Sequence, residues 1–291
     1  MNHTGLALAR SRSFLFVPAN RLDRLPKALA SGAHAVIIDL EDAVAPEHKA
    51  AAREALAREW ALLPVGQRER IAIRVNAVGT AWHEDDHALL GQLGPQPPGA
   101  VMLPKAETAT AVERVARSTG AAVLPLIESC QGLHAIDIIA RARGVLRIAF
   151  GHLDFQADLG MHCGADEREL DAVRLALVMA SRRADLPPPI DGVTIALDDD
   201  DRLAADTARS RRFGFGAKLC IHPRQVATVN EALGPTAAQR EWARRVLEAS
   251  RANGTGAFRL EGEMIDAPVL QRARSLLQPD PFPDPGINPQ G

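Results

Sequence analysis

The sequence predicts a closed (β/α)8 TIM barrel, in which eight parallel strands alternate with helices, followed by a C-terminal helical extension. Short, bounded apolar runs recur eight times between residues 13 and 221, as expected for parallel strands that are buried on both faces. Segments with helical spacing separate these runs, which indicates βαβ units. Eight such units span about 220–235 residues, within the usual range for a barrel. A doubly wound open sheet is the alternative.

The predicted strands are apolar runs that end where a proline or a polar residue begins. Pro18 stops the first run, and a carboxylate follows several of the others. In chain order, the strands are expected at Ser13–Val17, Ala35–Asp39, Ile71–Val75, Ala100–Leu103, Ala122–Ile127, Leu146–Phe150, Ile190–Ile195 and Ala217–Ile221.

The predicted helices occupy the segments between the strands. The helix from Pro46 carries Pro and Glu in its first turn, a common start signal. Leu133, Ile136 and Ile139 lie at helical spacing between the fifth and sixth strands. In chain order, the helices are expected at Arg21–Ser31, Pro46–Leu63, Trp82–Leu93, Glu107–Ser118, Cys130–Arg143, Asp166–Ala184, Asp199–Phe213, His222–Leu233 and Thr236–Ala252.

We expect a barrel domain at 1–235 and an extension at 236–291, and the pattern changes after residue 252. Residues 253–260 contain two glycines and predict a flexible linker. Glu261–Leu277 combines a short apolar segment with a final helix. The remaining residues are rich in Pro and Asp and are expected to be extended or disordered.

The composition favours a cytoplasmic protein that binds neither nucleic acid nor membranes. The chain carries 34 basic and 36 acidic residues, a net charge of −2, without a basic stripe. Its three cysteines lie far apart, which excludes a CxxC site and a dense disulfide framework and fits a reducing compartment. No apolar run approaches the roughly 20 residues of a membrane span.

Glu128 and Asp154 are the strongest candidate metal ligands. Each follows the last apolar residue of a predicted strand, and the two strands are joined by one helix. Both carboxylates should therefore emerge at the same edge of the sheet, where the sites of α/β proteins lie. With no His or Cys at ligand spacing, they suit a hard cation such as Mg²⁺. The alternative is that one caps a helix and the other forms a salt bridge.

Other polar residues follow the remaining strands. Acidic groups with one guanidinium suit a divalent ion that holds an anionic oxo-acid beside an oxyanion stabilised by Arg74. Alternatively, the strand-two acids cap the next helix and Arg74 forms an interior salt bridge. Lys105 could be a Schiff-base lysine, although a structural role is preferred, and packing or capping is favoured for His222. These residues are Asn20, Arg21, Asp39, Glu41, Asp42, Arg74, Asn76, Lys105 and His222. No GxGxxG, GxxxxGK[ST] or GxSxG motif occurs.

Seven motifs, in order between Arg12 and Val226, resemble the citrate lyase beta subunit family, and the resemblance covers about residues 12–277. That family includes malyl-CoA, citramalyl-CoA and citryl-CoA lyases and belongs with the HpcH/HpaI aldolases. The motifs identify the family but not the substrate. They are R-S-x-L-F-V-P at Arg12–Pro18, D-L-E-D-A-V at Asp39–Val44, R-V-N at Arg74–Asn76, L-P-K at Leu103–Lys105, I-E-S at Ile127–Ser129, G-x-x-D-F-x-A-D-L-G at Gly151–Gly160, and K-L-C-I-H-P-R-Q-V at Lys218–Val226.

The resemblance implies a set of roles at the strand ends. It implies Mg²⁺ on Glu128 and Asp154, with Glu41 and Asp42 holding metal-bound waters and Asp39 beside them. It implies Arg74 against the substrate carboxylate or thioester oxygen, and backbone N–H groups around Leu153 and Asp154 facing the oxo-acid. The basic residues that would meet the coenzyme A phosphates are Arg21, Arg24 and Lys27.

The C-terminal segment carries a further implied role. M-I-D at Met264–Asp266 resembles the tail motif of the CoA-ester lyases, whose Asp is the catalytic acid/base. In sequence, Asp266 has no evident structural partner, and the apolar residues around it need a surface to cover them. The resemblance implies that this tail completes the site of a neighbouring subunit, so we expect a homo-oligomer built from trimers, such as a trimer or hexamer. A tail packed on its own barrel is the alternative.

Two departures from the family pattern stand near the site. Ala19-Asn20 replaces a Gly that usually follows V-P, and His152-Leu153 replaces the common Ala-Glu before the metal-binding Asp. The second change removes a carboxylate and adds an imidazole. It therefore bears on which oxo-acid the site accepts.

Together these observations predict a Mg²⁺-dependent carbon–carbon lyase that cleaves a 3-hydroxy-3-carboxyacyl-CoA to acetyl-CoA and an oxo-acid. Malyl-, citramalyl- and citryl-CoA all remain open. One alternative is a citrate lyase beta-type subunit that acts on an acyl-carrier-bound thioester together with partner subunits. The other is an acyl-CoA thioesterase, which would result if water later attacked the thioester.

Overall fold

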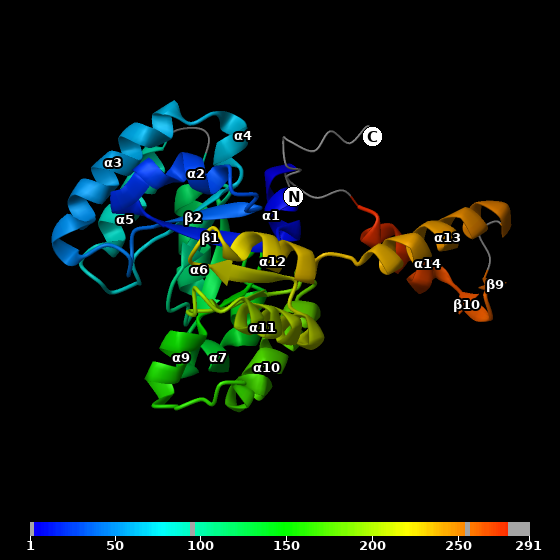
Figure 1. Ribbon diagram of the computed structural model, residues 1–291. Helices are drawn as coiled ribbons and strands as arrows, with labels where there is room; N and C mark the ends of the chain where they lie inside the picture. Colours follow the sequence, from blue (N-terminus) through cyan, green and yellow to red (C-terminus); the bar gives the residue numbers. More distant parts are fainter. Residues whose placement is uncertain (1–2, 94–96, 254–256, 279–291) are drawn as a thin grey trace. The chain divides into compact units, whose positions relative to one another are not determined.

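The computed structural model describes residues 3–93, 97–253 and 257–278, and its first compact unit confirms the predicted barrel. Eight parallel strands close on themselves in chain order, and β8 pairs with β1. Figure 1 shows the helices arranged around the outside of these strands. The strands are β1 (Ser13–Pro18), β2 (Ala35–Asp39), β3 (Ile71–Arg74), β4 (Ala100–Leu103), β5 (Ala122–Ile127), β6 (Ala149–Phe150), β7 (Ile190–Asp191) and β8 (Ala217–Cys220).

Alternating side chains along each strand build two apolar layers. Ile37 of β2 belongs to the cluster inside the barrel, whereas its neighbours Val36 and Ile38 belong to the cluster between strands and helices. Leu8 joins the inner cluster from a short N-terminal helix that sequence reasoning did not predict. The two layers fix the strand register, and the register brings the C-terminal ends of all the strands to one face of the barrel.

The helices follow the predicted order, with several differences in extent. The segment between β5 and β6 forms two short helices instead of one, because the backbone at Ala135 leaves the helical region. The helical elements of this unit are α1 (His3–Arg10), η1 (Ala19–Arg24), α2 (Leu25–Leu29), η2 (Pro46–His48), α3 (Lys49–Leu62), α4 (Val65–Arg68), α5 (His83–Gln92), α6 (Ala109–Thr119), α7 (Cys130–His134), α8 (Ile136–Ala140), α9 (His152–Leu159), η3 (Arg168–Leu170), α10 (Asp171–Arg183), α11 (Asp200–Phe213) and α12 (Gln225–Leu233).

The sixth and seventh strands are much shorter than predicted. Three prolines without backbone N–H groups precede Ile190, which limits how early β7 can pair. Beyond Asp191, Gly192 lies against the ring of His152, so closely that a Cβ there would stand 2.1 Å from Nδ1. The chain leaves the sheet at this point, and the side chain of Thr194 bonds to Asp206 of α11 instead.

The second compact unit comprises Gly234–Gly291. Its helix α13 (Ala237–Asn253) and helix α14 (Ala267–Leu276) share an apolar cluster with a hairpin of β9 (Phe258–Leu260) and β10 (Glu263–Ile265). The predicted linker at 253–260 is therefore wrong in part, because residues 258–260 form a strand that packs with the helices. Residues 254–256 of that linker and the Pro-rich end at 279–291 lie outside the described residues.

Within the described part of the chain, none of the helices combines the length and apolar character that crossing a lipid bilayer requires.

Candidate functional site

A cavity of about 340 Å³ opens at the C-terminal ends of the barrel strands. Its apolar lining comes from β1, β5, β6, β8 and the segment after β7. Its charged lining comes from β2, β3, the segments that follow β2 and β5, and the first turn of α9. The apolar lining consists of Phe16, Leu126, Phe150, Val193 and Leu219, and the charged lining consists of Asp39, Asp42, Arg74, Glu128 and Asp154.

Glu128 is buried directly after β5 and is held by backbone. Its Oε1 accepts the Lys105 N–H at 2.8 Å. Lys105 has a φ of 44°, in the left-handed region that L-residues rarely adopt. The backbone is therefore strained at the residue whose N–H binds the Glu128 carboxylate. Gly151 leaves room for the carboxylate, because a Cβ there would lie 2.4 Å from Oε2. Lys105 thus contributes through its backbone, in agreement with the structural role preferred from sequence.

Asp154 lies in the first turn of α9 and lines the same cavity. Unlike Glu128, it is exposed to solvent. The first N–H groups of a helix have no partner within the helix, and the helix dipole favours negative charge there. Leu153 lines the cavity from this turn. The predicted carboxylates Glu128 and Asp154 therefore line one cavity, next to the N-terminus of α9.

Arg74 is surrounded by three carboxylates, a group that we call the Arg74 cluster (Arg74, Asp39, Glu41 and Asp42). Nε and Nη2 donate to the two oxygens of Asp39 at 2.7 Å each, and Nη1 lies 3.0 Å from Glu41 and 3.6 Å from Asp42. Although burial opposes its charge, these carboxylates raise the pKa of Arg74. Asp39 also accepts two backbone N–H groups of the loop after β2. The interior salt bridge that was the sequence alternative for Arg74 therefore occurs. The acids do not cap the following helix, because the N-caps of η2 and α3 have no side-chain hydrogen bond and Asp39 bonds to the loop instead.

The residues of the cavity fit a divalent cation. Burial, with the charges of Glu41 and Asp154, raises the pKa of Glu128 to about 8. Burial likewise raises the pKa of Glu41 to about 7, despite the nearby guanidinium of Arg74. Carboxylates under such strain are stabilised by a cation. Among the described residues, no group of three or more His, Cys, Asp or Glu forms a metal site. Two carboxylates with room for water and substrate match Mg²⁺, which usually keeps several waters.

A second cavity of about 520 Å³ adjoins the first through three shared lining residues, Phe16, Ala43 and Ile221. Arg24 and Lys27, two of the three residues expected to meet coenzyme A, line it. The third, Arg21, forms an ion pair with Asp23 at 2.9 Å on the surface. His222 also lines this cavity, and its Nδ1 accepts the Arg224 N–H.

Asp266 has a structural partner that the sequence did not reveal. It is the N-cap of α14, and its Oδ1 accepts the Val269 N–H at 3.1 Å. The sequence expectation that this acid lacks a partner is therefore wrong. The cap uses one carboxylate oxygen, which leaves the other for a different contact.

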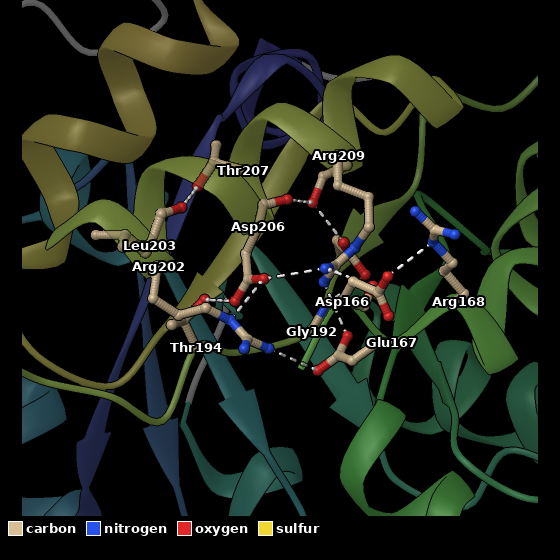
Figure 2. A network of polar contacts seen from close by, with 12 residues as sticks. Asp166, Glu167, Arg168, Gly192, Thr194, Arg202, Leu203, Asp206, Thr207 and Arg209 are labelled. Carbon is tan, nitrogen blue, oxygen red and sulfur yellow. Dashed lines mark hydrogen bonds and ion pairs between the residues drawn. The ribbon is translucent and has the colours of Figure 1, made fainter. Parts of the chain in front are cut away.

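Sequence reasoning missed a buried ionic group behind the cavity wall. We call it the Glu167 cluster; Figure 2 shows part of it. Glu167 contacts Arg174 through Oε2, lies 2.8 Å from Arg209 and 3.7 Å from Arg202, and its Oε1 lies 3.5 Å from His152 Nε2. The cluster occupies the layer between β7, β8 and helices α10 and α11. Its members are Glu167, Arg174, Asp191, Arg202, Asp206, Arg209 and Lys218.

The one available signal for this cluster was the spacing of Arg202, Asp206 and Arg209 on a single face of α11. Charges at such spacing usually mark a solvent-facing surface. Here that face of α11 lies towards the strands. Asp191 and Lys218 project from the outer side of β7 and β8, and Lys218 provides a positive charge near Asp206.

Comparisons with known proteins agree with this architecture. Residues 12–223 match the family described as HpcH/HpaI aldolase/citrate lyase. The chain is 38% identical to a citrate lyase subunit beta-like protein from Deinococcus radiodurans, over 91% of this chain and 96% of that protein. It is 32% identical to a (3S)-malyl-CoA thioesterase from Cereibacter sphaeroides, over 91% of this chain and 93% of that one.

Among solved structures, the CitE protein of Mycobacterium tuberculosis in complex with magnesium, acetoacetate and coenzyme A has a TM-score of 0.76 and 36% identity, over 92% of this chain and 97% of the other. The family match covers most of the barrel, and the relatives are similar over nearly the whole length. The chain belongs to the HpcH/HpaI aldolase/citrate lyase family.

Proposed function

We propose that the protein is a Mg²⁺-dependent lyase that cleaves the carbon–carbon bond of a 3-hydroxy-3-carboxyacyl-CoA, giving acetyl-CoA and an oxo-acid. One observation carries the proposal: buried Glu128 and exposed Asp154 share a cavity with Arg74. The adjoining cavity with Arg24 and Lys27 is the proposed coenzyme A site. Related CitE structures contain magnesium and, in one case, coenzyme A, which supports the assignment.

In this proposal, Glu128 and Asp154 would hold Mg²⁺, which lowers the pKa of a bound hydroxyl, and Glu41, Asp42 and Asp39 would order the waters around it. A base takes the hydroxyl proton, the carbon–carbon bond breaks, and its electron pair passes to the thioester, forming an enolate. Arg74 stabilises the enolate oxygen, an effect worth on the order of 3–4 kcal/mol per donor. Asp266 delivers a proton to the enolate carbon, which yields the acetyl thioester. The backbone N–H groups near Leu153 and Asp154 orient the oxo-acid carboxylate.

Thioester hydrolysis is a second candidate, because a relative is a (3S)-malyl-CoA thioesterase. A citrate lyase beta-type subunit, acting on an acyl-carrier-bound thioester with partner subunits, is a third, since a relative carries that name. The test uses the purified chain alone with Mg²⁺ and malyl-, citramalyl- and citryl-CoA. Release of acetyl-CoA with an oxo-acid is expected. Free CoA with an intact hydroxy acid would show a thioesterase, and no reaction with any ester would contradict the proposed lyase.

We also propose that the protein is a cytoplasmic homo-oligomer, a trimer or hexamer, in which Asp266 of one chain completes the site of another. The exposed Met264 beside it supports a partner for this segment. Mixing Glu128→Ala with Asp266→Ala protomers under subunit exchange should restore part of the activity. If exchange is proven and every mixture stays inactive, the trans arrangement is wrong.

A further inference from the structure

The Asp154 carboxylate depends on its backbone for its position. It forms no hydrogen bond or salt bridge within the part of the chain that the structure describes, whereas Glu128 accepts the Lys105 N–H. The exposed Asp154 side chain lies in the first turn of α9. Its place beside Glu128 is therefore set by whatever fixes the start of this helix.

The sheet contributes little restraint at this point of the barrel. Strand β6, which leads into α9, is two residues long. It pairs with β5 at two positions and with β7 at one, Ala149 with Ile190. Backbone that few ladder bonds hold opens more easily than the rest of a fold. Side chains of α9 must therefore supply the remaining restraint.

Only two of the eight residues of α9, all of them described by the structure, are buried. Phe155 packs on the Phe150 ring at 5.8 Å between centroids, an apolar contact with little directional preference. Asp158, near the far end of the helix, accepts the Cys130 N–H at 2.7 Å. The other buried residue, His152, is the first of the helix and lies in the turn that carries Asp154.

The ring of His152 lies against a fixed piece of backbone. A Cβ at Gly192 would stand 2.1 Å from Nδ1 and 3.0 Å from Cγ. Gly192 cannot move aside freely, because its carbonyl accepts Lys218 Nζ at 2.8 Å and its N–H donates to Asp191 at 2.9 Å. This contact holds one side of the imidazole.

The other side of the imidazole meets a carboxylate that is equally fixed. Nε2 of His152 lies 3.5 Å from Glu167. Glu167 contacts Arg174 and lies 2.8 Å from Arg209 (Figure 2). Its backbone has a φ of 50°, in the left-handed region, where strain persists only if the surroundings impose it. Glu167 therefore gives His152 a rigid partner.

Resting on the metal site of the proposed lyase, we propose that His152 is a positioning residue for Asp154. Held between Gly192 and Glu167, it fixes the first turn of α9 and thereby places the Asp154 carboxylate beside Glu128 for the cation. His152 lines the cavity, but its Nε2 is turned towards Glu167. It therefore acts through Asp154 and not on the substrate.

The test is Mg²⁺ binding to the full chain without substrate, measured by calorimetry. In His152→Ala both contacts are lost, and the affinity for Mg²⁺ is expected to fall about tenfold or more, as when the support of a metal ligand is removed. His152→Gln keeps an N–H donor that can reach Glu167 and should retain most of the wild-type affinity. Wild-type affinity in His152→Ala, or an equal loss in both variants, would overturn the inference.

A structural control separates positioning from a general loss of stability. Val112→Ala removes buried apolar atoms from α6. It should lower the Tm and leave the affinity for Mg²⁺ unchanged, because it makes no contact with the Asp154 carboxylate. If Val112→Ala weakens Mg²⁺ binding as much as His152→Ala does, the effect of His152 is merely structural.

Gly192→Ala disturbs the same contact without changing His152. The added Cβ collides with the imidazole, whereas Gly91→Ala on α5 is the matched control, because a Cβ there meets nothing within 4 Å. Hydrogen exchange in metal-free protein should become faster across residues 151–160 in Gly192→Ala and in His152→Ala, but not in Gly91→Ala. The affinity for Mg²⁺ should fall in the same two variants. Wild-type exchange and affinity in Gly192→Ala would show that this contact does not fix α9.

Failure of the proposed function is recognised separately. If the CoA esters are not cleaved while Mg²⁺ binds the wild type and its affinity falls in His152→Ala, the lyase reaction falls and the positioning role stands. If the esters are cleaved but His152→Ala binds Mg²⁺ as the wild type does, the lyase reaction stands and the positioning role falls. A wild-type chain that binds no Mg²⁺ would remove both.

Discussion

The Arg74 cluster and the Glu167 cluster are opposites in charge. At the barrel mouth, one guanidinium faces three carboxylates. Behind the cavity wall, one carboxylate faces three guanidinium groups. The pKa values shift in opposite directions: burial, to which neighbouring carboxylates add, raises the pKa of Glu41 and Glu128. For Glu167, burial works against the charge, but contacts with His152 and Arg174 still lower the pKa.

This difference shows that an excess of negative charge can distinguish a functional site from a group of ion pairs that stabilises the fold. The Glu167 cluster contains four cations, Arg174, Arg202, Arg209 and Lys218, and three carboxylates, because Asp191 and Asp206 join Glu167; the charges differ by only one. Arg174, Asp191 and Lys218 are buried between strands and helices, whereas Arg202, Asp206 and Arg209 line a separate cavity of about 590 Å³. The Arg74 cluster remains short of positive charge and opens to a cavity. We therefore expect changes at the mouth to affect chemistry and changes in the Glu167 cluster to affect folding.

The largest effect should come from Glu128→Gln. Activity is expected to fall roughly 10³-fold or more, because metal-assisted stabilisation is worth several kcal/mol. The amide can still accept the Lys105 N–H, and a strained buried charge is removed, so metal-free stability should be unchanged or higher. Steady-state kinetics and thermal denaturation of Glu128→Gln are compared with Glu54→Gln, a change at an exposed glutamate on α3. Near-normal turnover in Glu128→Gln would remove the metal hypothesis.

Glu167→Gln should have the largest effect on stability. It leaves Arg174 and Arg209 buried beside a neutral group, and breaking a buried ion pair typically costs about 3–5 kcal/mol. Chemical denaturation should show this loss. Glu169→Gln, two residues away on the exposed side of η3, is the matched control and should change stability by no more than about 0.5 kcal/mol. Equal stability of the two variants would show that the cluster is not the scaffold we describe.

Arg74→Lys should reduce activity by about 10²-fold while the protein remains folded. An ammonium group carries the charge but cannot make the paired contacts with Asp39 that orient the guanidinium. Initial-rate kinetics are measured beside Arg114→Lys, which alters an exposed pair with Glu84. Arg74 would be structural only if Arg74→Lys lost stability and kept its kcat/KM.

The smallest effect is the pH dependence of stability without metal. Glu128 and Glu41 have folded pKa values of about 8 and 7, above their ordinary value of 4.5. The folded state therefore binds more protons than the unfolded state between these values, and stability falls as pH rises through this window. Glu167 has a lowered pKa, so its stabilising contribution is present above the unfolded pKa and is lost at lower pH.

Thermal denaturation from pH 4 to 8.5 in EDTA should consequently show the highest Tm on the weakly acidic side of neutrality. Saturating Mg²⁺ should reduce the decline towards pH 8.5, and Glu128→Gln should reduce it without metal. A metal-free Tm that rises steadily to pH 8.5 would contradict the proposed crowding of carboxylates at the mouth.

The sequence by itself determined the barrel and most of its mouth. Apolar runs of strand length, alternating with helical segments, permit few other folds. A residue at the end of a parallel strand, such as Arg74, or just past it, such as Glu128, must lie on the face where all the strands end. Its approximate place therefore follows from local pattern alone, without knowledge of its contacts.

Only the tertiary structure decided which charges are paired. Arg74 and Asp39 are 35 residues apart, and Glu167 and Arg209 are 42 apart. Charged residues on α11 could equally have faced solvent, because a helical pattern of charges does not state which side is buried. The partners arrive from neighbouring strands, and burial becomes acceptable only when opposite charges meet. For the same reason, sequence could not show that His152 is already turned towards Glu167, since that contact depends on how β6, β7 and α10 pack together.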